Sequence, residues 1–564
     1  MLRFIITYLL ILLSFTLVHA KDIDTNEDAL KKMIGRMLVV GFENEKIDKD
    51  TKIVKQIQKY DLGGVILFDR FIDDKNKTKN IRSSAQLTEL TSKLKSFSKK
   101  PLLISIDQEG GKVARLKPAL GFTEIPSAKT VATFSLSHAR ETYEAQANML
   151  QQNGINCDFA PVVDLAVNPD NMVISGLERS YGGSSDIVTQ YARIFMNSLK
   201  KENIISVLKH FPGHGSSVGD SHEGFVDISQ TWNKKELEPY RNLINSKDAD
   251  VIMTAHVFNS QLDKEYPATL SYNVNTKLLR DEMHYKGIII SDDLQMKAIS
   301  DHFTLKETVT LAINSGVDIL LFANQLAKQD IDILIDTIYY QVQSGAIALA
   351  RIIESNHRIE NLHIKNSIIN MPIDFTDNRV QMTKDYIKQH YGLEPQNIII
   401  EPKIIVLHWT AVMNFDDSFR RLKQEKLYSD RSDIASAGAL NVSSHFLVAR
   451  DGTIYQLMPD NWMARHVIGL NYSSIGVENI GGEGDKKEDL TEAQLQANIK
   501  LVQYLKAKYP EIEYLIGHLE YTQMESTPLW LEKDADYRTK KVDPGEKFMA
   551  QVRESVKDLE LQKP

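Results

Sequence analysis

The sequence predicts an α/β protein in which a (β/α)8, TIM-like barrel is followed by a smaller mixed α/β domain. From about residue 30 to residue 365, short apolar runs alternate with amphipathic segments. Each run is rich in β-branched residues and apolar on both faces, which is typical of buried parallel strands. Near residue 366 this alternation ends. The runs are MLVVGF, GGVILF, LLISID, CDFAPVVD, ISVLKH, VIMTAH, IIISDD and VDILLF.

The overall composition is that of a globular chain with more than one domain. Its 564 residues are too many for one ordinary core, and 42% of them are hydrophobic and 25% are charged. The formal net charge is −8, so no global basic field exists to hold a polyanion, and nucleic acid is not expected as a partner. The single cysteine, Cys157, leaves no internal disulfide and is interpreted as a core residue.

The first twenty residues have the pattern of a secretory signal peptide. Arg3 supplies a positive start, residues 4–18 are apolar, and VHA at 18–20 resembles a cleavage site. The alternative is an uncleaved anchor, although the run is shorter than the roughly 20 apolar residues that span a bilayer. No other segment is apolar enough to cross one. The sequence therefore predicts export across the inner membrane, to the periplasm, with no stable membrane span after cleavage.

Polar residues end several of the apolar runs, and in barrels of this class the active site lies at the carboxyl ends of the strands. We therefore expect the chemistry of the first domain at these positions, since the ends of neighbouring parallel strands meet at one edge of a barrel. They are Asp107, Asp164, Lys209, His210, His256 and Asp292.

Two of these places carry residue types that suit sugar chemistry. The loop after ISVLKH contains Asp220 and His222, and an aspartate beside a histidine can orient it and raise its pKa for general-acid work. Asp292 ends the run GIIISDD, where a carboxylate can attack an anomeric carbon. Asp293 competes for that role. Side chains alternate along a strand, so only one of the two faces the substrate, and spacing alone leaves the choice open.

Eight ordered motifs between Ile106 and Met296 resemble those of the bacterial β-N-acetylhexosaminidases of glycoside hydrolase family 3. They are IDQEGGKVARL, INCDFAPVVDLA, LERSYGG, KHFPGHG, DSH, MTAHV, PATLS and SDDLQM. The resemblance implies a retaining glycosidase without a cofactor. It implies Asp292 as the nucleophile, His222 as the general acid/base and Asp220 as the partner of His222. It also implies residues that bind the terminal sugar, namely Asp107, Arg115, Arg179, Lys209 and His210.

The chain after residue 366 has a different pattern. We interpret 21–366 as the barrel, 367–400 as a linker and 401–564 as a second domain. The second domain has the strand-like runs KIIVLHW, HFLVARDGTIYQLM and SIGVENI, in which RDGT is a hairpin turn. An amphipathic helix at 491–509 follows, so the domain is a smaller mixed α/β unit.

Three residues of the second domain have the chemistry of zinc ligands: His408 in VLHWTA, His518 in IGHLEY and Asp543 in KVDPG. Two imidazoles and a carboxylate bind Zn²⁺ and leave one coordination position open for water. A lone histidine is more often a surface or core residue, so the scattered positions alone do not establish a metal. Glu478 in SIGVEN follows an apolar run, and a carboxylate near zinc can take and return the protons of an amide cleavage.

Six ordered motifs of this domain resemble those of the zinc amidases related to peptidoglycan recognition proteins. They are VLHWTA, SSHFLVARDGTIYQLMPD, ARHVIG, SIGVEN, IGHLEY and KVDPG. The resemblance implies cleavage between N-acetylmuramic acid and L-alanine, with Zn²⁺ held by the two histidines and the aspartate named above. It further implies Glu478 as the catalytic carboxylate and Lys541 as the residue that stabilises the oxyanion. His445 and His466 also lie in these motifs and are interpreted as structural or substrate-contacting residues.

Together the two halves predict a bifunctional hydrolase whose partners are peptidoglycan fragments, or muropeptides. One domain removes terminal β-N-acetylglucosamine and the other cleaves the muramoyl-L-alanine amide. In a first alternative, the C-terminal half is a non-catalytic peptidoglycan-binding module, but all three ligand positions hold ligand-competent residues, which favours an enzyme. In a second alternative the barrel is a phosphorylase, because a histidine acid/base tolerates phosphate near the site.

Overall fold

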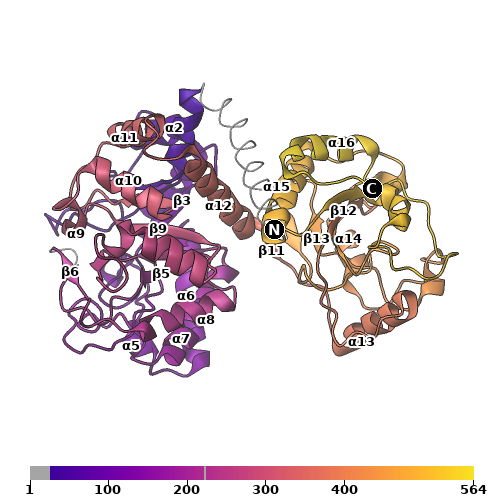
Figure 1. Cartoon of the computed structure of the whole chain (residues 1–564), viewed down its shortest axis with the longest axis horizontal. Coiled ribbons are helices and arrows are strands. Elements are labelled where there is room, and N and C mark those ends of the chain that lie inside the picture. The colour runs from indigo at the N-terminus through magenta and orange to yellow at the C-terminus, as the bar shows by residue number, and fades with distance from the viewer. Residues whose placement is uncertain (1–25, 221–223) are drawn as a thin grey trace, which may run out of the picture. The chain divides into compact units, whose positions relative to one another are not determined.

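The computed structural model describes residues 26–220 and 224–564, which form two compact units (Figure 1). The first unit ends at His363, and the second is Ile364–Pro564. The predicted signal peptide at 1–20 and the predicted acid His222 lie outside the described residues. Within the two described ranges, no helix combines the length and the apolar character that a membrane crossing requires.

The first unit is a closed barrel of eight parallel strands in the order β1-β10-β9-β7-β5-β4-β3-β2. This confirms the predicted barrel, and each of the eight apolar runs supplies one strand. The strands are buried on both faces because the barrel interior covers one face and the surrounding helices cover the other. Their bounds are β1 Leu38–Gly41, β2 Gly64–Ile66, β3 Leu103–Ile106, β4 Cys157–Asp158, β5 Ile205–Phe211, β7 Val251–Thr254, β9 Ile288–Asp293 and β10 Ile319–Phe322.

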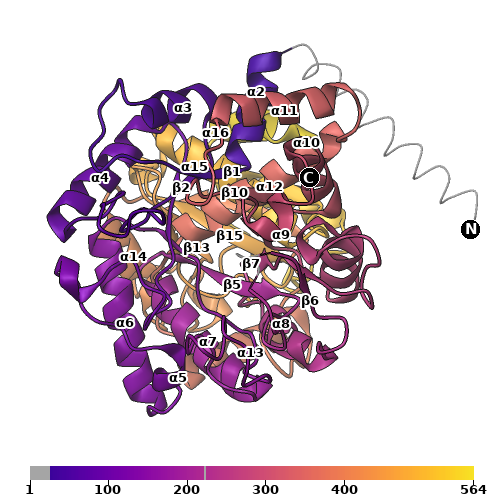
Figure 2. The same cartoon turned by 90° about the vertical axis from the view of Figure 1, so that its left-hand side faces the viewer.

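Helices connect these strands. They are α2 Glu27–Arg36, α3 Lys52–Tyr60, α4 Ser84–Phe97, α5 Ala128–Val131, α6 Leu136–Gln152, α7 Ser185–Lys201, α8 Glu238–Asn245, the π-helix Asn273–Glu282, α9 Lys297–Ser300, α10 Leu305–Ser315, α11 Ile331–Gln343 and α12 Leu349–Ser367. Local sequence sets their ends: Ser135 caps α6, and Thr304 and Glu307 form a capping box on α10. Helices such as α3, α4, α6 and α7 lie outside the strands (Figure 2). A small sheet pairs β6 Val226–Asp227 with β8 Val257–Phe258.

The second unit is built on a six-stranded sheet in the order β11-β14-β13-β15-β12-β16. Strands β13 and β14 form the predicted antiparallel hairpin, and the other neighbours are parallel. The strands are β11 Ile369–Asn370, β12 Ile404–Trp409, β13 Phe446–Val448, β14 Ile454–Gln456, β15 Ser474–Asn479 and β16 Tyr514–Gly517. The helices are α13 Asp377–Tyr386, α14 Phe415–Lys423, α15 Glu492–Lys508 and α16 Glu546–Ser555. The predicted mixed α/β domain is confirmed.

Strand β12 is buried on both faces of this sheet. Ile405 and Leu407 pack in one hydrophobic cluster, and Ile404 and Val406 pack in another. This division follows from the two-residue period of a strand, which sends successive side chains to opposite faces. The sheet therefore has two apolar layers, and the residue that continues 404 and 406 is His408.

The segment predicted as a linker, 367–400, belongs instead to the second unit. Strand β11 pairs with β14 through Ile369 and Tyr455. Ile373 is 4% exposed, and Tyr386 and Tyr391 pack in the same cluster as β12. The sequence did not reveal this because the strand is two residues long and its partner lies more than 80 residues further along the chain.

Candidate active sites

A cavity of about 340 Å³ lies in the first unit, where the ends of β3, β5 and β9 meet. It brings together residues that the sequence separates by more than 180 positions, as expected for the carboxyl edge of a barrel. The predicted residues among its lining are Asp107, Arg115, Arg179, Lys209, His210, Asp220 and Asp292. His222 lies two residues beyond Asp220, outside the described part of the loop.

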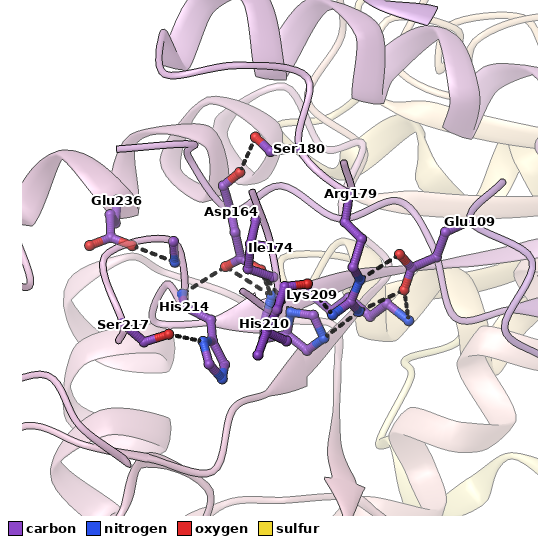
Figure 3. Close-up of polar contacts among 12 residues, drawn as sticks. Glu109, Asp164, Ile174, Arg179, Ser180, Lys209, His210, His214, Ser217 and Glu236 are labelled. Atoms are coloured by element: carbon purple, nitrogen blue, oxygen red, sulfur yellow. Dashed lines mark hydrogen bonds and ion pairs between the residues drawn. The ribbon is translucent and has the colours of Figure 1, made fainter. Parts of the chain in front are cut away.

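Two carboxylates of this cavity form ion pairs with lysine and arginine side chains. Asp107 accepts from Lys209 Nζ at 2.9 Å and from Arg115 Nη2 at 3.2 Å. Glu109 accepts two parallel bonds from Arg179, each 2.8 Å long, and its Oε1 lies 2.7 Å from Lys209 Nζ (Figure 3). Such bidentate pairs fix the direction of a guanidinium as well as its charge. The ion pairs thus hold the lysine and arginine side chains of the cavity in fixed positions.

Burial and charge oppose each other in these pairs. Burial alone would raise the pKa of Glu109, but Arg179 and Lys209 hold it well below its usual range. Burial alone would lower the pKa of Lys209, but Asp107 and Glu109 raise it. The groups are therefore charged at neutral pH and present fixed hydrogen-bond donors and acceptors to a ligand.

Glu109 was not among the predicted site residues. Its partner Arg179 lies 70 positions away in sequence, so composition and spacing gave no sign of the pair. One signal was present, because Glu109 stands two residues after Asp107 and the two-residue period places such side chains on one side of an extended segment. The structure adds it to the cavity lining.

His210 is held between Asp164 and Arg179. Its Nδ1 lies 2.7 Å from Asp164 Oδ2, and its Nε2 lies 3.2 Å from Arg179 Nη2. A guanidinium only donates, so Nε2 must accept and Nδ1 must carry the proton that is donated to Asp164. Asp164 also accepts from the backbone N–H of His214 at 2.8 Å. Asp164, on the segment that follows β4, thus positions the histidine that lines the cavity.

The structure distinguishes Asp292 from Asp293. Asp293 is 7% exposed, and its Oδ1 accepts from the backbone N–H groups of Gln295 and Ala323 at 3.2 and 3.1 Å. These bonds tie its carboxylate to the turn that follows β9 and to the end of β10. Both carboxylates line the cavity, and Asp292 is the more exposed of the two. The arrangement favours Asp292 as the carboxylate that meets a substrate.

The second unit gathers its predicted residues on one face of the sheet. His408 continues the face of Ile404 and Val406, and His518 follows β16 two residues after Ile516, which packs in the same cluster. Glu478 is the register partner of His408 on β15. The period of a strand therefore brings all three side chains to the same side of adjacent strands.

His408, His518 and Asp543 form a nearly regular triangle of ligand atoms. The two Nδ1 atoms are 3.0 Å apart, and Asp543 Oδ2 lies 3.2 Å from His408 Nδ1 and 3.1 Å from His518 Nδ1. Tetrahedral zinc with bonds near 2.0–2.1 Å implies ligand separations of about 3.3 Å. A proton can be shared by only two of the three atoms, whereas a central cation satisfies all three. The triangle fits a metal ion.

Glu478 is a half-buried carboxylate in register with His408, one of the triangle residues. Its Oε2 has no hydrogen-bond partner within the described part of the chain, although it is fully enclosed. Burial raises the pKa of Glu478 to about 7, and the nearby His408, Lys541 and Arg431 act in the opposite direction. Lys541 is partly exposed and lies two residues before Asp543. The arrangement can hold a proton next to a metal ion.

The two further histidines of this unit have different surroundings. His445 is bonded to the backbone at both nitrogens, since Nδ1 accepts from Gly476 N at 2.9 Å and Nε2 donates to Trp462 O at 2.7 Å. His466 lies with Nδ1 3.0 Å from His408 Nε2. The structural interpretation of His445 is consistent with these bonds, whereas His466 contacts one of the triangle residues.

Family models match both units of the chain. The model described as "Glycosyl hydrolase family 3 N terminal domain" matches residues 29–362, which is more than half of the chain. The chain belongs to glycosyl hydrolase family 3. A second model, "N-acetylmuramoyl-L-alanine amidase", matches residues 386–546 of the same chain. The family 3 chain therefore carries an amidase-type domain after its barrel.

Individual relatives match the barrel. Beta-hexosaminidase A of Pseudoalteromonas piscicida is 32% identical over 326 residues, which cover 51% of this chain and 53% of that protein. Beta-hexosaminidase LpqI of Mycobacterium tuberculosis is 34% identical over 271 residues, which cover 46% of this chain and 68% of that protein. The chain thus spans between half and about two thirds of the length of these curated relatives.

Solved structures give the same fold. The structure of M. tuberculosis LpqI is 29% identical with a TM-score of 0.51, and the match covers 59% of this chain and 93% of that one. A glycoside hydrolase family 3 β-N-acetylglucosaminidase from Paenibacillus sp. FPU-7 has a TM-score of 0.54 and is 24% identical, with 89% of this chain and 88% of that one covered. The second likeness supports the fold alone.

Proposed function

We propose that this family 3 protein is a bifunctional muropeptide hydrolase. Its barrel removes terminal β-N-acetylglucosamine with retention, and its second unit is a zinc-dependent N-acetylmuramoyl-L-alanine amidase. The observation that carries the proposal is the presence of two separate constellations in one chain. One is the cavity that joins Asp292 to a set of charged sugar-binding groups, and the other is the ligand triangle beside Glu478.

In the barrel, Asp292 attacks the anomeric carbon and forms a glycosyl-enzyme, while an acid on the loop that begins at Asp220 protonates the leaving oxygen. The sequence-based choice for this acid is His222. The same residue then deprotonates the water that releases the sugar. Asp107 holds Lys209 and Arg115 by ion pairs, so these cations meet the sugar hydroxyls in fixed positions.

In the second unit, His408, His518 and Asp543 would hold Zn²⁺. A bound zinc ion lowers the pKa of a water to about 7 and polarises a carbonyl oxygen. Glu478, whose Oε2 has no hydrogen-bond partner among the described residues, takes the proton that attack on the amide releases and returns it to the leaving amine. Lys541 donates to the oxygen on which negative charge develops. Cleavage separates the lactyl carbonyl of muramic acid from L-alanine.

The proposed place of action follows from the same assignments. The signal-like residues 1–20 support export to the periplasm, where fragments of peptidoglycan are the partners that both activities require. A defined disaccharide-peptide offers both bonds in one molecule, and mass spectrometry of its digest tests both activities at once. The proposal predicts three products: free N-acetylglucosamine, free peptide and the remaining muramic acid.

The binding-module alternative makes a different prediction. It expects the zinc-loaded protein to bind the muropeptide and leave the amide intact. A digest in phosphate buffer also separates hydrolysis from phosphorolysis, because a phosphorylase releases N-acetylglucosamine 1-phosphate. An intact amide would end the amidase proposal, and sugar phosphate as the main product would end the hydrolase proposal for the barrel.

A further inference from the structure

The nitrogen of His408 that points away from the triangle is itself hydrogen-bonded. His408 Nε2 lies 3.0 Å from His466 Nδ1, and His466 Nε2 lies 3.1 Å from Ser474 Oγ. Ser474 Oγ in turn donates to Leu470 O at 2.8 Å. All three side chains are buried, with His408 and Ser474 at 1% and 0% exposure. The four groups form one chain of hydrogen bonds that begins at the triangle and ends on a backbone carbonyl.

The carbonyl at the end of this series of hydrogen bonds fixes the donor and the acceptor in each of them. Leu470 O only accepts, so the Ser474 hydroxyl proton is used there and its oxygen accepts from His466 Nε2–H. A neutral imidazole carries one proton, so His466 Nδ1 is then an acceptor. It receives the proton of His408 Nε2, which leaves Nδ1 of His408 with a lone pair directed at the triangle. The opposite direction would place a proton on that Nδ1 and block a metal.

A second feature of the fold makes room for the His466 ring. Gly476 lies on β15 between Ile475 and Val477. Any side chain at this position would occupy the space that the imidazole of His466 fills. A Cβ at this position would lie 2.7 Å from His466 Cγ and 2.8 Å from its Nδ1. Contacts this short do not occur in folded proteins, so the ring would have to move. The glycine therefore allows the ring to reach His408.

We propose that His466 is a positioning residue, which holds His408 as the Nε2–H tautomer and so keeps Nδ1 available to the metal. This inference rests on the proposed metal site of the amidase and adds a residue to it. Metal-bound histidines commonly donate their other N–H to an acceptor, and loss of the acceptor costs roughly 10–100-fold in metal affinity or activity. Here the acceptor is a neutral imidazole, whose own orientation is set by Ser474.

The test measures the dissociation constant of Zn²⁺ from the full chain by competition with a chromophoric chelator. His466→Leu removes the acceptor, and we expect weaker binding by roughly 10–100-fold. His466→Asn supplies an amide oxygen close to the place of Nδ1, and it should recover most of the lost affinity. Gly476→Ala keeps the imidazole but displaces it, and should weaken binding in the same direction as His466→Leu.

The matched control is His390→Gln. His390 is also a buried imidazole of the second unit, but its nitrogens bond to Glu532 and to Ala437 O. The His390→Gln substitution should lower the thermal midpoint of the chelator-treated protein without changing the zinc dissociation constant. Equal zinc affinity in the wild type and in His466→Leu would overturn the proposal, and so would an Asn variant as weak as the Leu variant.

Failure of the amidase proposal looks different from failure of this one. A wild-type chain that binds no zinc overturns both proposals. A wild-type chain that binds zinc tightly, together with unchanged affinity in all three variants, leaves the metal site in place and removes only the role of His466. If His466→Leu does not fold, Gly476→Ala and His466→Asn decide the outcome, since both retain a polar group at the site.

Discussion

The two sites of this chain balance their charges in opposite ways. In the barrel, Asp107 and Glu109 are neutralised by Lys209, Arg115 and Arg179, which belong to the same cavity. In the second unit, the ion-pair partners that the described residues offer to Asp543 are the two histidines of the triangle.

This difference decides what each site must obtain from outside. Ion pairs that are complete within the fold present fixed donors to a neutral sugar. Two imidazoles and a carboxylate that converge on one point are instead suited to a cation from solution. One chain thus combines a site built on its own charges with a site whose three ligand atoms fit a metal ion.

The largest expected difference between the two sites comes from removing the proposed nucleophile of the barrel, Asp292. Asp292→Ala should lower release of N-acetylglucosamine by up to roughly 10⁶-fold, the scale seen when a nucleophile that acts within a catalytic unit is lost. Amide cleavage should not change, because the second site belongs to the other compact unit. The measurement is the two product yields from one disaccharide-peptide. Substantial glycosidase activity in this variant would redirect attention to Asp293.

The second comparison is the response to metal removal. A chelator should end amide cleavage and zinc should restore it, while hydrolysis of an aryl N-acetylglucosaminide continues. His518→Ala removes one ligand and should lose both the metal and the amidase activity, because three protein ligands are needed for a site of this kind. Metal content by atomic spectroscopy is the direct readout. Inactivation of the barrel by the same chelator would show that the contrast between the sites is wrong.

The third comparison separates the metal from the proton transfer. Glu478→Gln keeps the size of the side chain but cannot exchange a proton, and we expect amidase turnover to fall by roughly 10²–10⁴-fold. Zinc content should stay near that of the wild type, since Glu478 is not one of the three triangle residues. A variant that loses the metal together with turnover would make Glu478 a ligand instead.

Sequence and structure agree best where one local pattern is sufficient. The eight apolar runs identify the strands, and residues at their ends reach the cavity because the ends of parallel strands meet at one edge. Glu109 was missed because its contact with Arg179 spans 70 positions, and no local pattern encodes a pair at that separation. The choice of Asp292 needed the bonds of Asp293 to Gln295 and Ala323.

The contribution of the buried ion pairs to the stability of the first unit can be measured by substitution. Arg179→Met removes one partner of the buried Glu109, and breaking such a pair costs roughly 3–5 kcal/mol, here toward the lower end because Lys209 remains 2.7 Å away. Arg193→Met is the control, because Arg193 and Asp248 form a more exposed pair, worth about 0–1 kcal/mol.

The pH dependence of this loss has a definite sign. Arg179 and Lys209 hold the pKa of Glu109 below its usual range, so the pair stabilises the fold above the unfolded pKa of about 4.3. That contribution is lost as pH falls through the folded value. The difference in unfolding free energy between wild type and Arg179→Met should therefore be full near pH 7 and shrink below about pH 4. Chemical denaturation at several pH values measures it, and a constant difference would contradict the ion-pair explanation.

The last comparison tests where the second unit begins. Ile373 lies in the segment 367–400, and it is 4% exposed in a cluster with Leu447 and Leu457. Truncating a buried isoleucine costs roughly 2–5 kcal/mol, so Ile373→Ala should destabilise the amidase-type unit and weaken amide cleavage on heating. Ile369→Ala is the control, because that side chain is 37% exposed. Glycosidase activity should keep its thermal midpoint in both variants. If Ile373→Ala instead behaves like the control, the segment tolerates change as a linker does, and the boundary of the second unit moves towards residue 400.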